Sequence, residues 1–426
     1  MNSYFATAEQ QDNPAWRGKV LGVCEHLGGI IIAASIEAKK WGIKTGTPVW
    51  EAKKIYPKII LTHTRAEAYR KYNRLLVKLV SDYTDKIEIA SIDEVYLDLT
   101  KACNIRKVVS GELLVASNPF EEAVEIAKEI KQRMKTEVGD YLTCSVGIAE
   151  NKLLAKIASD MQKPNGLTVI KNQELGIENQ EKQYLEHALV VTMDELYKKL
   201  RLVDVPGIGR RMEKRLNALG IHTLLELKNF PQSLLVAAFG PIAGYHFYNM
   251  GQLRGSWKPA VHQENDIKSI GHMYTLPQEF RQPKFFVPVL YKLCEMVGRR
   301  IRKKNLSGNI IIFYVRGQNY ESYGESEKLS FYTDDGREIF SQCMRIFQRL
   351  SIKPGEFKMI GITVAGLRPM QRQLSLFGTQ ERSARLTQAL DKINSKYGDF
   401  TVCRVPILAA GKVFRDSIGF GRVKEM

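Results

Sequence analysis

The chain has 426 residues, of which 44% are hydrophobic and 26% charged, the composition of an ordinary globular protein. Its 63 Lys and Arg residues outnumber its 46 Asp and Glu residues and leave a formal net charge of +17, which favours a polyanionic partner such as nucleic acid or an acidic membrane surface. Because no apolar run approaches the ~20 residues that span a bilayer, no secretory signal is recognisable and the 6 cysteines form no CxxC pair, we expect a cytoplasmic protein without a membrane span or structural zinc.

The first predicted elements are short strands and turns, followed by one clear helix. Residues Gly42 to Pro48 are rich in glycine and basic residues but lack the residue order of a P-loop, so we expect a loop without a phosphate cradle. Apolar residues recur at helical spacing from Glu67 to Val80, which predicts an amphipathic helix with one buried face.

Two adjacent carboxylates, Asp93 and Glu94, lie between two strand-like runs, Lys86–Ala90 and Val95–Leu97. Neighbouring side chains on a regular strand point to opposite faces, so these two carboxylates can share a site only at the bend of a hairpin. Two carboxylates held together repel each other, and divalent cations make such an arrangement stable. A solvated acidic turn is the alternative, and these residues alone leave both interpretations open.

Helices and strands alternate after this hairpin and predict an α+β domain with the acidic hairpin on its sheet. The predicted elements are a helix from Pro119 toward Val138, a strand from Leu142 to Ile148, a helix from Lys152 to Met161 and a strand from Leu167 to Ile170. Residues 171–200 are polar and charged, and we interpret them as a surface insertion or a connecting helix.

The segment from Leu202 to Gly251 is predicted to be helical with glycine turns, and its start resembles a helix-hairpin-helix. Glycines in such a turn allow close approach to a DNA backbone, and the N–H groups that open the next helix face a phosphate. A turn that merely joins two packed helices is the alternative. The predicted DNA-binding residues are Gly207, Gly209, Arg210, Arg211 and Lys214.

Residues 253–266 show no periodicity and are interpreted as a linker to a second α+β unit. Its predicted elements are a strand (269–276), a helix (286–303), two strands (309–315 and 328–332), a helix (336–350) and a strand (359–367), which is the βαββαβ order of a small ferredoxin-like domain. The first of these helices ends in a basic cluster. A helix dipole needs only one or two cations, so we predict phosphate contacts by Arg299, Arg300, Arg302 and Lys303.

The last part of the chain is predicted to be a tail with one helix from Glu381 to Asn394. Exposed Leu and Phe side chains in a tail leave apolar area in water unless a partner's pocket receives them, although a short buried strand is the alternative. Residues 373–377 of this tail match the bacterial sliding-clamp-binding peptide Gln-Leu-x-Leu-Phe. We therefore predict clamp contacts by Gln373, Leu374, Leu376 and Phe377.

Taken together, these motifs resemble those of a Y-family translesion DNA polymerase of the bacterial DNA polymerase IV/UmuC-like type, over nearly the whole chain. The most specific matches are Ser91–Asp98, Glu37–Ile43, Ser145–Lys156 and Lys163–Gly166. The resemblance implies an α+β, multidomain right-hand polymerase with a palm (1–7 and 67–168, first strand truncated), small fingers (8–66), a helix-hairpin-helix thumb (169–252), a linker (253–266), a ferredoxin-like little finger (267–370) and a tail with the clamp peptide (371–426).

The resemblance also assigns roles to individual residues. Asp93 would bridge two Mg²⁺ ions and Glu94 would bind the catalytic one, so that the ions activate the primer 3′-hydroxyl and stabilise the pyrophosphate leaving group. Lys163 would contact the incoming triphosphate. Phe5 falls on the steric-gate position, where an aromatic ring clashes with a ribose 2′-hydroxyl. The expected dNTP-binding residues are Phe5, Tyr4, Lys39 and Lys163.

Three departures from the family pattern concern this chain. The family's opening strand ends in a metal-binding Asp one residue before the position of Met1, so we expect a fragment, an internal start or a loss of catalysis, with only the Met1 backbone carbonyl in register as a ligand. Ile36 and Lys39 occupy positions where many members carry Tyr and Arg, and Lys39 keeps the charge without the bidentate fork. The segment 171–200 is also longer than is usual in the family.

The leading hypothesis is therefore template-directed, low-fidelity DNA synthesis from dNTPs on primer-template DNA, by a monomer that binds the sliding clamp. A non-catalytic adaptor for DNA and the clamp, descended from such polymerases, is the alternative. A general helix-hairpin-helix DNA-binding factor is a third possibility, but it does not account for the acidic hairpin.

Overall fold

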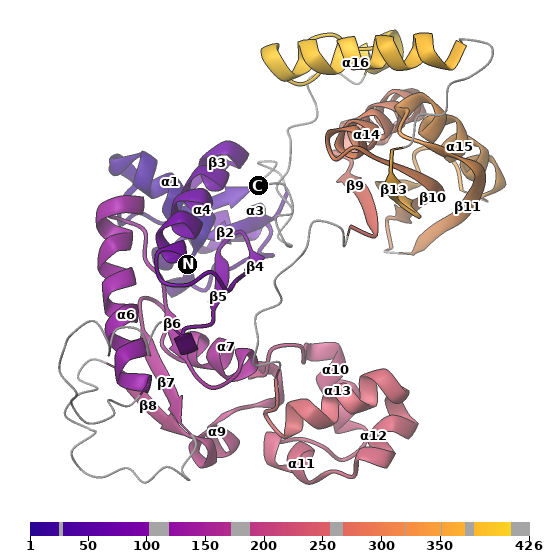
Figure 1. Ribbon diagram of the computed structural model, residues 1–426. Helices are drawn as coiled ribbons and strands as arrows, with labels where there is room; N and C mark the ends of the chain where they lie inside the picture. The colour runs from indigo at the N-terminus through magenta and orange to yellow at the C-terminus, as the bar shows by residue number, and fades with distance from the viewer. Residues whose placement is uncertain are drawn as a thin grey trace. The chain divides into compact units, whose positions relative to one another are not determined.

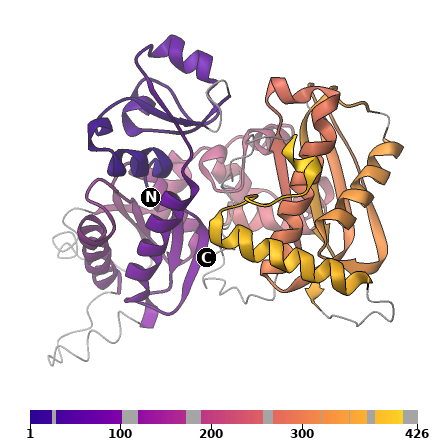
Figure 2. The same ribbon diagram turned by 90° about the horizontal axis from the view of Figure 1, so that it is seen from above.

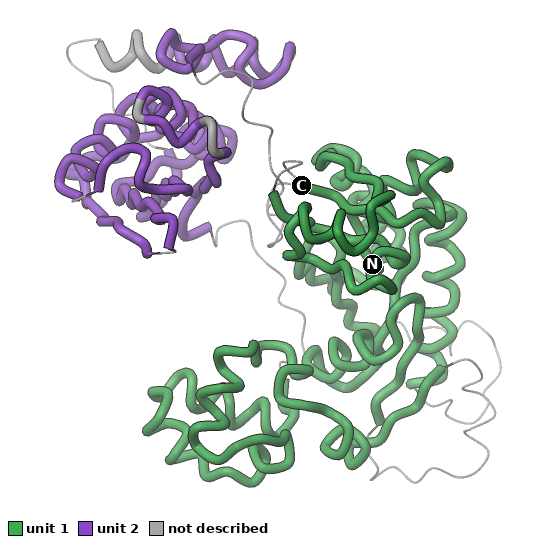
Figure 3. Tube along the Cα trace, turned by 180° about the vertical axis from the view of Figure 1, so that it is seen from behind, with its two compact units in different colours: residues 1–262, 416–426 green, residues 263–415 purple. Residues whose placement is uncertain are grey.

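The computed structural model describes residues 1–24, 29–101, 119–171, 188–255, 267–319, 321–350, 352–370 and 379–409 (Figure 1). The chain divides into two compact units, residues 1–262 with 416–426, and residues 263–415 (Figure 3). Each unit is described by itself. Within the described ranges, no helix has the length and apolarity needed to cross a membrane.

The chain begins with a small lobe built on a three-stranded sheet. Its elements are α1 (Tyr4–Asp12), β1 (Leu21–Cys24), β2 (Ile31–Ala34), α2 (Ile36–Lys40), α3 (Val49–Ile55) and β3 (Ile60–His63). The strand order is β2-β1-β3, with β1 antiparallel to β2 and parallel to β3. Helices α2 and α3 contribute Ala38, Val49 and Ala52 to its apolar core.

The next region carries the acidic hairpin between helices. Its elements are α4 (Ala66–Ser81), β4 (Ile87–Ser91), β5 (Glu94–Leu97), α6 (Pro119–Arg133), a π-helical turn (Met134–Val138), β6 (Val146–Ile148), α7 (Lys152–Met161), β7 (Leu167–Lys171), β8 (Leu189–Thr192) and α9 (Met193–Lys199). Strands β4 and β5 form an antiparallel pair, whereas β6, β7 and β8 form a separate parallel sheet. The predicted hairpin and the predicted helices of this region are therefore confirmed, but the hairpin is a sheet of its own and does not belong to the sheet of β6, β7 and β8, as was predicted.

Two other predictions for this region, the start of one strand and the structure of residues 171–200, also need correction. The strand predicted from Leu142 begins only at Val146, because Leu142 N–H donates to the Gly139 carbonyl in a turn and the Thr143 carbonyl accepts from Asn2 N–H. Part of the stretch interpreted as a surface insertion or a connecting helix is strand β8, followed by α9. Val191 and Leu196 are buried there, so this part belongs to the core. Residues 172–187 lie outside the described ranges.

The helical end of the first unit consists of a 3₁₀ turn (Leu202–Asp204), α10 (Arg210–Asn217), α11 (Leu224–Asn229), α12 (Gln232–Phe239) and α13 (Pro241–Gly251). Its core is continuous with α7 and α9, because Leu154, Leu196, Leu216 and Phe247 belong to one buried cluster. The prediction of helices joined by glycine turns is confirmed.

The second unit has the predicted βαββαβ order. Its elements are β9 (Ser269–Thr275), a 3₁₀ turn (Gln278–Arg281), α14 (Pro283–Lys303), β10 (Leu306–Gly317), β11 (Ser322–Thr333), α15 (Gly336–Arg349), β12 (Phe357–Ala365) and the short β13 (Arg368–Pro369). The strand order β11-β10-β12-β9 is antiparallel throughout, so each strand-helix-strand pair is split by a strand of the other pair. Helices α14 and α15 pack their apolar faces against one side of this sheet.

The described part of the predicted tail, residues 379–409, is folded and contains the predicted helix. Helix α16 (Thr379–Tyr397) and the short α17 (Val405–Leu408) belong to the second unit, and Figure 2 shows α16 in yellow lying across it. The contact with α14 is largely polar. Arg302 binds Asp391 with both carboxylate oxygens, at 2.6 and 3.1 Å, and the guanidinium of Arg404 lies 3.2 Å from Glu295.

The ion pair between Arg302 and Asp391 should stabilise α16 against local unfolding. In Asp391→Ala, the Arg302 guanidinium, whose side chain is only 10% exposed, loses its bidentate partner. Loss of one partner from a buried pair costs several kcal/mol at full burial, so a cost of about 2 kcal/mol is expected here. Amide hydrogen exchange in α16 should accelerate by more than about tenfold.

Asp399→Ala is the matched control, because Asp399 is 56% exposed and such pairs contribute about 1 kcal/mol or less. Equal exchange in α16 for the two variants would show that the Arg302–Asp391 pair does not hold the helix.

Candidate active site

The predicted acidic hairpin turns over two residues, Ile92 and Asp93, so that Ser91 of β4 lies opposite Glu94 of β5. Three contacts fix this turn. The Ile92 side chain is buried, the Ile92 carbonyl accepts a 2.6 Å hydrogen bond from the Asn73 side chain of α4, and the Ser91 hydroxyl donates to the Asp93 carboxylate at 2.7 Å. Asp93 therefore lies in the bend and Glu94 opens the next strand, and both side chains line the same cavity.

A lysine network from α7 holds the second carboxylate. Lys156 forms an ion pair with Glu94 and lies 3.5 Å from Asp160, and Asp160 also pairs with Lys163 at 2.5 Å. Burial opposes the charged form of Lys156, but the bond and charge of Glu94 outweigh it and raise the pKa of Lys156. Lys156 is thereby held as a cation beside the Glu94 side chain.

The first residue of the chain lies at the hairpin bend. The Met1 amino group donates to the Asp93 carbonyl at 2.5 Å, and burial lowers the pKa of that amino group. Next to it, Asn2 N–H donates to the Thr143 carbonyl at 2.9 Å. The predicted role of the Met1 carbonyl as a metal ligand remains a prediction.

A second cavity, of about 540 Å³, brings together six of the seven residues predicted for catalysis and nucleotide binding. Its wall runs from the N-terminus and α1 through β2 and α2 to the hairpin bend and the loop after α7. The six residues are Met1, Tyr4, Phe5, Lys39, Asp93 and Lys163. Glu94 lines the adjacent cavity instead, together with Met1, Asp93 and Lys163.

Positive charge gathers on one side of this second cavity. Burial and the nearby charge of Lys163 lower the pKa of Lys39, and Asp93 only partly offsets this effect. Ile36, one turn before Lys39 on α2, also lines the cavity and offers no hydrogen bond. Two mutually repelling lysines beside a cavity favour a bound anion, because an anion relieves their repulsion.

The predicted steric-gate ring is held by a residue that the sequence analysis missed. Phe5 stacks on Tyr69 of α4, with ring centroids 4.3 Å apart and planes 10° from parallel, and the Tyr4 hydroxyl donates to the Tyr69 carbonyl at 2.5 Å. The Tyr69 hydroxyl in turn donates to the buried carboxylate of Glu9 at 2.7 Å, and Glu9 pairs with Arg65. Tyr69 shares the buried face of α4 with Tyr72 and Asn73, so helical periodicity was the available signal.

The predicted helix-hairpin-helix turn has the geometry that its glycines allow. Gly207 has φ +102°, a conformation that other residues rarely adopt, and a Cβ there would lie 2.3 Å from the Met250 side chain. Gly209 caps α10, and the side chains of Arg210, Arg211 and Lys214 are exposed on that helix. The turn thus presents a helix N-terminus flanked by free cationic side chains, as the prediction requires.

The basic cluster of α14 differs from the prediction of four phosphate contacts. Arg299 pairs with Asp399 and Arg302 with Asp391, and their side chains are only 12% and 10% exposed. These two arginines pair with acidic residues of the C-terminal segment and are covered by it, which accounts for the surplus of charge that suggested DNA binding. Arg300 donates to the Gly271 carbonyl at 3.2 Å and Lys303 is exposed, so DNA contact stays a prediction for these two residues.

The four residues of the predicted clamp peptide, Gln373, Leu374, Leu376 and Phe377, lie outside the described ranges.

Comparison with known proteins gives consistent matches along the chain. Residues 1–160 match the impB/mucB/samB family, residues 267–376 match the C-terminal domain of that family, and residues 203–255 match the thumb domain of DNA polymerase-iota. Two solved structures resemble it at 26% identity. A Y-family DNA polymerase chimera of Dbh and Dpo4 has a TM-score of 0.66 over 85% of this chain and 96% of its own, and an insertion ternary complex of Dbh DNA polymerase has a TM-score of 0.53 over 86% and 96%.

Curated relatives match over almost their whole length. DNA polymerase IV of Moorella thermoacetica is 34% identical over 98% of this chain and 97% of its own. DNA polymerase IV of Pelotomaculum thermopropionicum is 30% identical over 98% and 96%, and DNA polymerase IV 1 of Bacillus subtilis is 29% identical over 93% and 89%. The chain therefore belongs to the Y family of DNA polymerases, in its DNA polymerase IV group, and its activity is template-directed translesion DNA synthesis.

Proposed function

We propose that the second cavity holds the incoming dNTP, with the primer terminus at the hairpin bend beside Asp93 and Glu94. The observation that carries this proposal is the lining of one cavity by a carboxylate, three lysines and two aromatic rings, from segments far apart in sequence. Lys39 and Lys163 would bind the triphosphate. Burial and the charge of Lys163 lower the pKa of Lys39, and the bound anion would relieve the repulsion between the two lysines.

Phe5 would select the sugar of this nucleotide. Its ring lies in the wall of the cavity and cannot retreat easily, because Tyr69 stacks on it and Tyr69 is fixed through Glu9. A ribose 2′-hydroxyl would therefore clash with a ring that its packing holds in place. The selection is therefore steric and depends on the stiffness of α1 against α4.

The donor set fits a divalent cation in part. Asp93 and Glu94 provide two carboxylates, and Mg²⁺ in phosphate-transfer sites is held by one or two carboxylates with substrate phosphates. Among the described residues, no group of three or more His, Cys, Asp or Glu side chains is placed to hold a metal ion. These residues thus suit one Mg²⁺ but lack a third acidic ligand for the proposed pair of ions. When bound, such ions would lower the pKa of the primer hydroxyl and stabilise the leaving pyrophosphate.

The chain's own residues prepare this chemistry by position. The Asn73 and Ser91 hydrogen bonds hold the Asp93 carboxylate at the bend, where it lines both cavities. Lys156 holds Glu94 next to it, on the side of α7. A phosphoryl group bound by Lys39 and Lys163 would lie between these carboxylates and the ring of Phe5.

Loss of either carboxylate should stop synthesis. Asp93→Asn and Glu94→Gln remove negative charge from the hairpin bend, and the rate of single-nucleotide primer extension is expected to fall by more than about a thousandfold. Asp85→Asn is the control, because Asp85 is an exposed acid just before β4. Synthesis by either site variant at the rate of the control would refute these assignments.

The gate assignment predicts a change in sugar discrimination. Phe5→Ala removes the ring from the cavity wall, so the ratio of kcat/KM for dNTP over rNTP should fall by about tenfold or more. Tyr4→Phe keeps both rings and loses only one hydrogen bond, so its ratio should stay close to that of the unaltered chain. An unchanged ratio in Phe5→Ala would exclude Phe5 as the gate.

We propose that the thumb turn binds the DNA backbone without sequence preference. Arg210→Ala and Lys214→Ala should each weaken binding to duplexes of any sequence and reduce the slope of log K against log salt by about 0.9. Lys198→Ala, on the exposed side of α9, is the matched control. A slope that is the same in all three variants would exclude phosphate contact at this turn.

The finer assignments complete the proposal. The palm (1–7, 67–168), fingers (8–66), thumb (169–252), linker (253–266) and little finger (267–370) are proposed as predicted from the sequence, as are a monomeric state, a cytoplasmic location and a clamp peptide at residues 373–377. The adaptor alternative finds no support in the relatives, which are named as polymerases.

A further inference from the structure

Four side chains of alternating charge connect the acidic hairpin to the turn after α7. Lys156 pairs with Glu94 and lies 3.5 Å from Asp160, and Lys163 lies 2.5 Å from Asp160. Both ammonium groups approach the same atom, Oδ1 of Asp160. We call these four residues the lysine network. Asp160 is its shared member, because it faces one lysine on each side.

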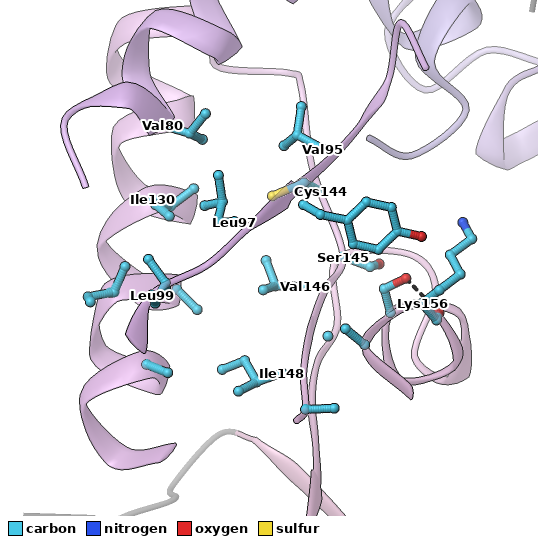
Figure 4. Close-up of a pocket in the computed structure, with 18 of the residues that line it drawn as sticks. Val80, Val95, Leu97, Leu99, Ile130, Cys144, Ser145, Val146, Ile148 and Lys156 are labelled. Atoms are coloured by element: carbon cyan, nitrogen blue, oxygen red, sulfur yellow. Dashed lines mark hydrogen bonds between the residues drawn. The ribbon is translucent and has the colours of Figure 1, made fainter. Parts of the chain in front are cut away.

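The spacing of residues along α7 explains how Asp160 comes to be shared. Lys156 and Asp160 are four positions apart on this helix, so their side chains lie on one face, and Lys163 follows three positions later in the turn after the helix. Figure 4 shows Lys156 at the side of the cavity opposite Val80 and Ile130. Two links of the lysine network are therefore local to this segment, and the third joins it to the hairpin.

The two ends of the lysine network reach different parts of the site. Glu94 lines the cavity of about 530 Å³ beside the hairpin bend, whereas Lys163 lines both this cavity and the second one, where Lys39 lies. In the proposed function, Glu94 binds a divalent cation and Lys163 binds the triphosphate. Asp160 is not among the residues that line either cavity, so it can act on both ligands only through the two lysines.

The contacts of Lys156 are divided between two carboxylates. Burial lowers the pKa of Lys156, but the hydrogen bond and charge of Glu94, with the charge of Asp160, outweigh it and raise that pKa. Asp160 lies closer to Lys163 than to Lys156, so Lys156 is bound mainly by Glu94. A carboxylate that loses one of two cations attracts the remaining one more strongly. The position of Lys156 therefore depends on whether Lys163 stays at Asp160.

We propose that Asp160 is a positioning residue that couples the triphosphate subsite to Glu94 through Lys163 and Lys156. A triphosphate that binds Lys163 draws this lysine away from Asp160. Asp160 then attracts Lys156 more strongly, and Lys156 moves away from Glu94. The Glu94 carboxylate thereby becomes more available to a divalent cation. This coupling rests on the proposed function, because it needs the assigned roles of Glu94 and Lys163.

The coupling is reciprocal, as linkage requires. A cation bound to Glu94 releases Lys156 toward Asp160, and Lys163 is then freer to bind the triphosphate. The side chains of the lysine network are between 24% and 46% exposed, so water screens their charges. We therefore expect each ligand to change the affinity for the other by about three- to fivefold.

The experiment measures each ligand separately on the full chain. Binding of Mn²⁺ to the free protein is followed through the electron paramagnetic resonance signal of the free ion, and the part that is lost in Glu94→Gln is assigned to that carboxylate. Binding of radiolabelled dATP is measured by equilibrium dialysis in EDTA, with a primer-template whose next template base is thymine. Neither measurement depends on catalysis.

Single substitutions should move the two affinities in opposite directions. Asp160→Asn leaves Lys163 to the nucleotide and Lys156 to Glu94, so the Kd of dATP should fall and the Kd of Mn²⁺ should rise, each by about three- to fivefold. Lys156→Met should have the reverse effects. Asp160→Glu keeps the shared carboxylate and should hold both Kd values within about twofold of those of the unaltered chain.

Glu125→Gln is the matched control. Glu125 pairs with Lys128 at 2.7 Å on α6, with the same spacing of three residues as Asp160 and Lys163. Neither Glu125 nor Lys128 lines the two cavities, so both Kd values should stay unchanged in this variant.

A double variant separates the coupling from a general effect of charge. Removal of any nearby acid favours anions and disfavours cations, and that effect is the same with or without Lys156. The coupling acts on Glu94 through Lys156. In the Lys156→Met background, Asp160→Asn should therefore leave the Kd of Mn²⁺ unchanged, whereas it should still lower the Kd of dATP.

Two results would overturn the coupling alone. One is an equal rise in the Kd of Mn²⁺ when Asp160→Asn is made with and without Lys156, and the other is weaker binding of both ligands in Asp160→Asn, as a merely structural role predicts. Unchanged binding of Mn²⁺ in Glu94→Gln and of dATP in Lys163→Met would instead refute the assigned roles, and the coupling with them.

Discussion

The two-residue turn at Ile92 and Asp93 is the constraint on which the active site depends. Adjacent carboxylates diverge on a regular strand, so they can serve one site only where the chain bends. The bend is held by its buried Ile92 side chain and by the hydrogen bond from Asn73 on α4. Helix α4 also supports the ring of Phe5 through Tyr69. One helix therefore sets both the position of the carboxylates and that of the Phe5 ring in the second cavity.

Charge has two different uses in this molecule. On α10, Arg210, Arg211 and Lys214 are exposed around a helix N-terminus, where phosphate can reach them. On α14, Arg299 and Arg302 are covered and pair with Asp399 and Asp391 of the C-terminal segment. Both clusters look alike in sequence, because local density of Lys and Arg says nothing about acidic partners 90 or so residues away. Part of the positive charge of the chain is therefore paired within the second unit and does not reach DNA.

Much of the fold follows from local patterns. Helical periodicity located α4 and α15 to within about one residue, and alternation with turn signals located the acidic hairpin and the βαββαβ order. Local patterns failed where contacts with residues distant in the sequence determine the local structure. Residues 142–145 alternate like a strand, but their backbone groups are taken by a turn and by Asn2, and the strand begins only at Val146. Strand β8 was missed because its apolar run is short and lies between polar and charged residues in the sequence.

The sequence by itself determined the family, the hairpin carboxylates and the residue types of the proposed nucleotide site, because these depend on short motifs whose chemistry is local. Only the tertiary structure decided which of these residues meet. It brought Phe5, Lys39 and Lys163 to one cavity, and it revealed Tyr69 behind the ring and Lys156 beside Glu94. It also showed that β5 and β6 line one cavity together with α4 and α6. Contacts of this kind join residues tens of positions apart, and packing in three dimensions selects them.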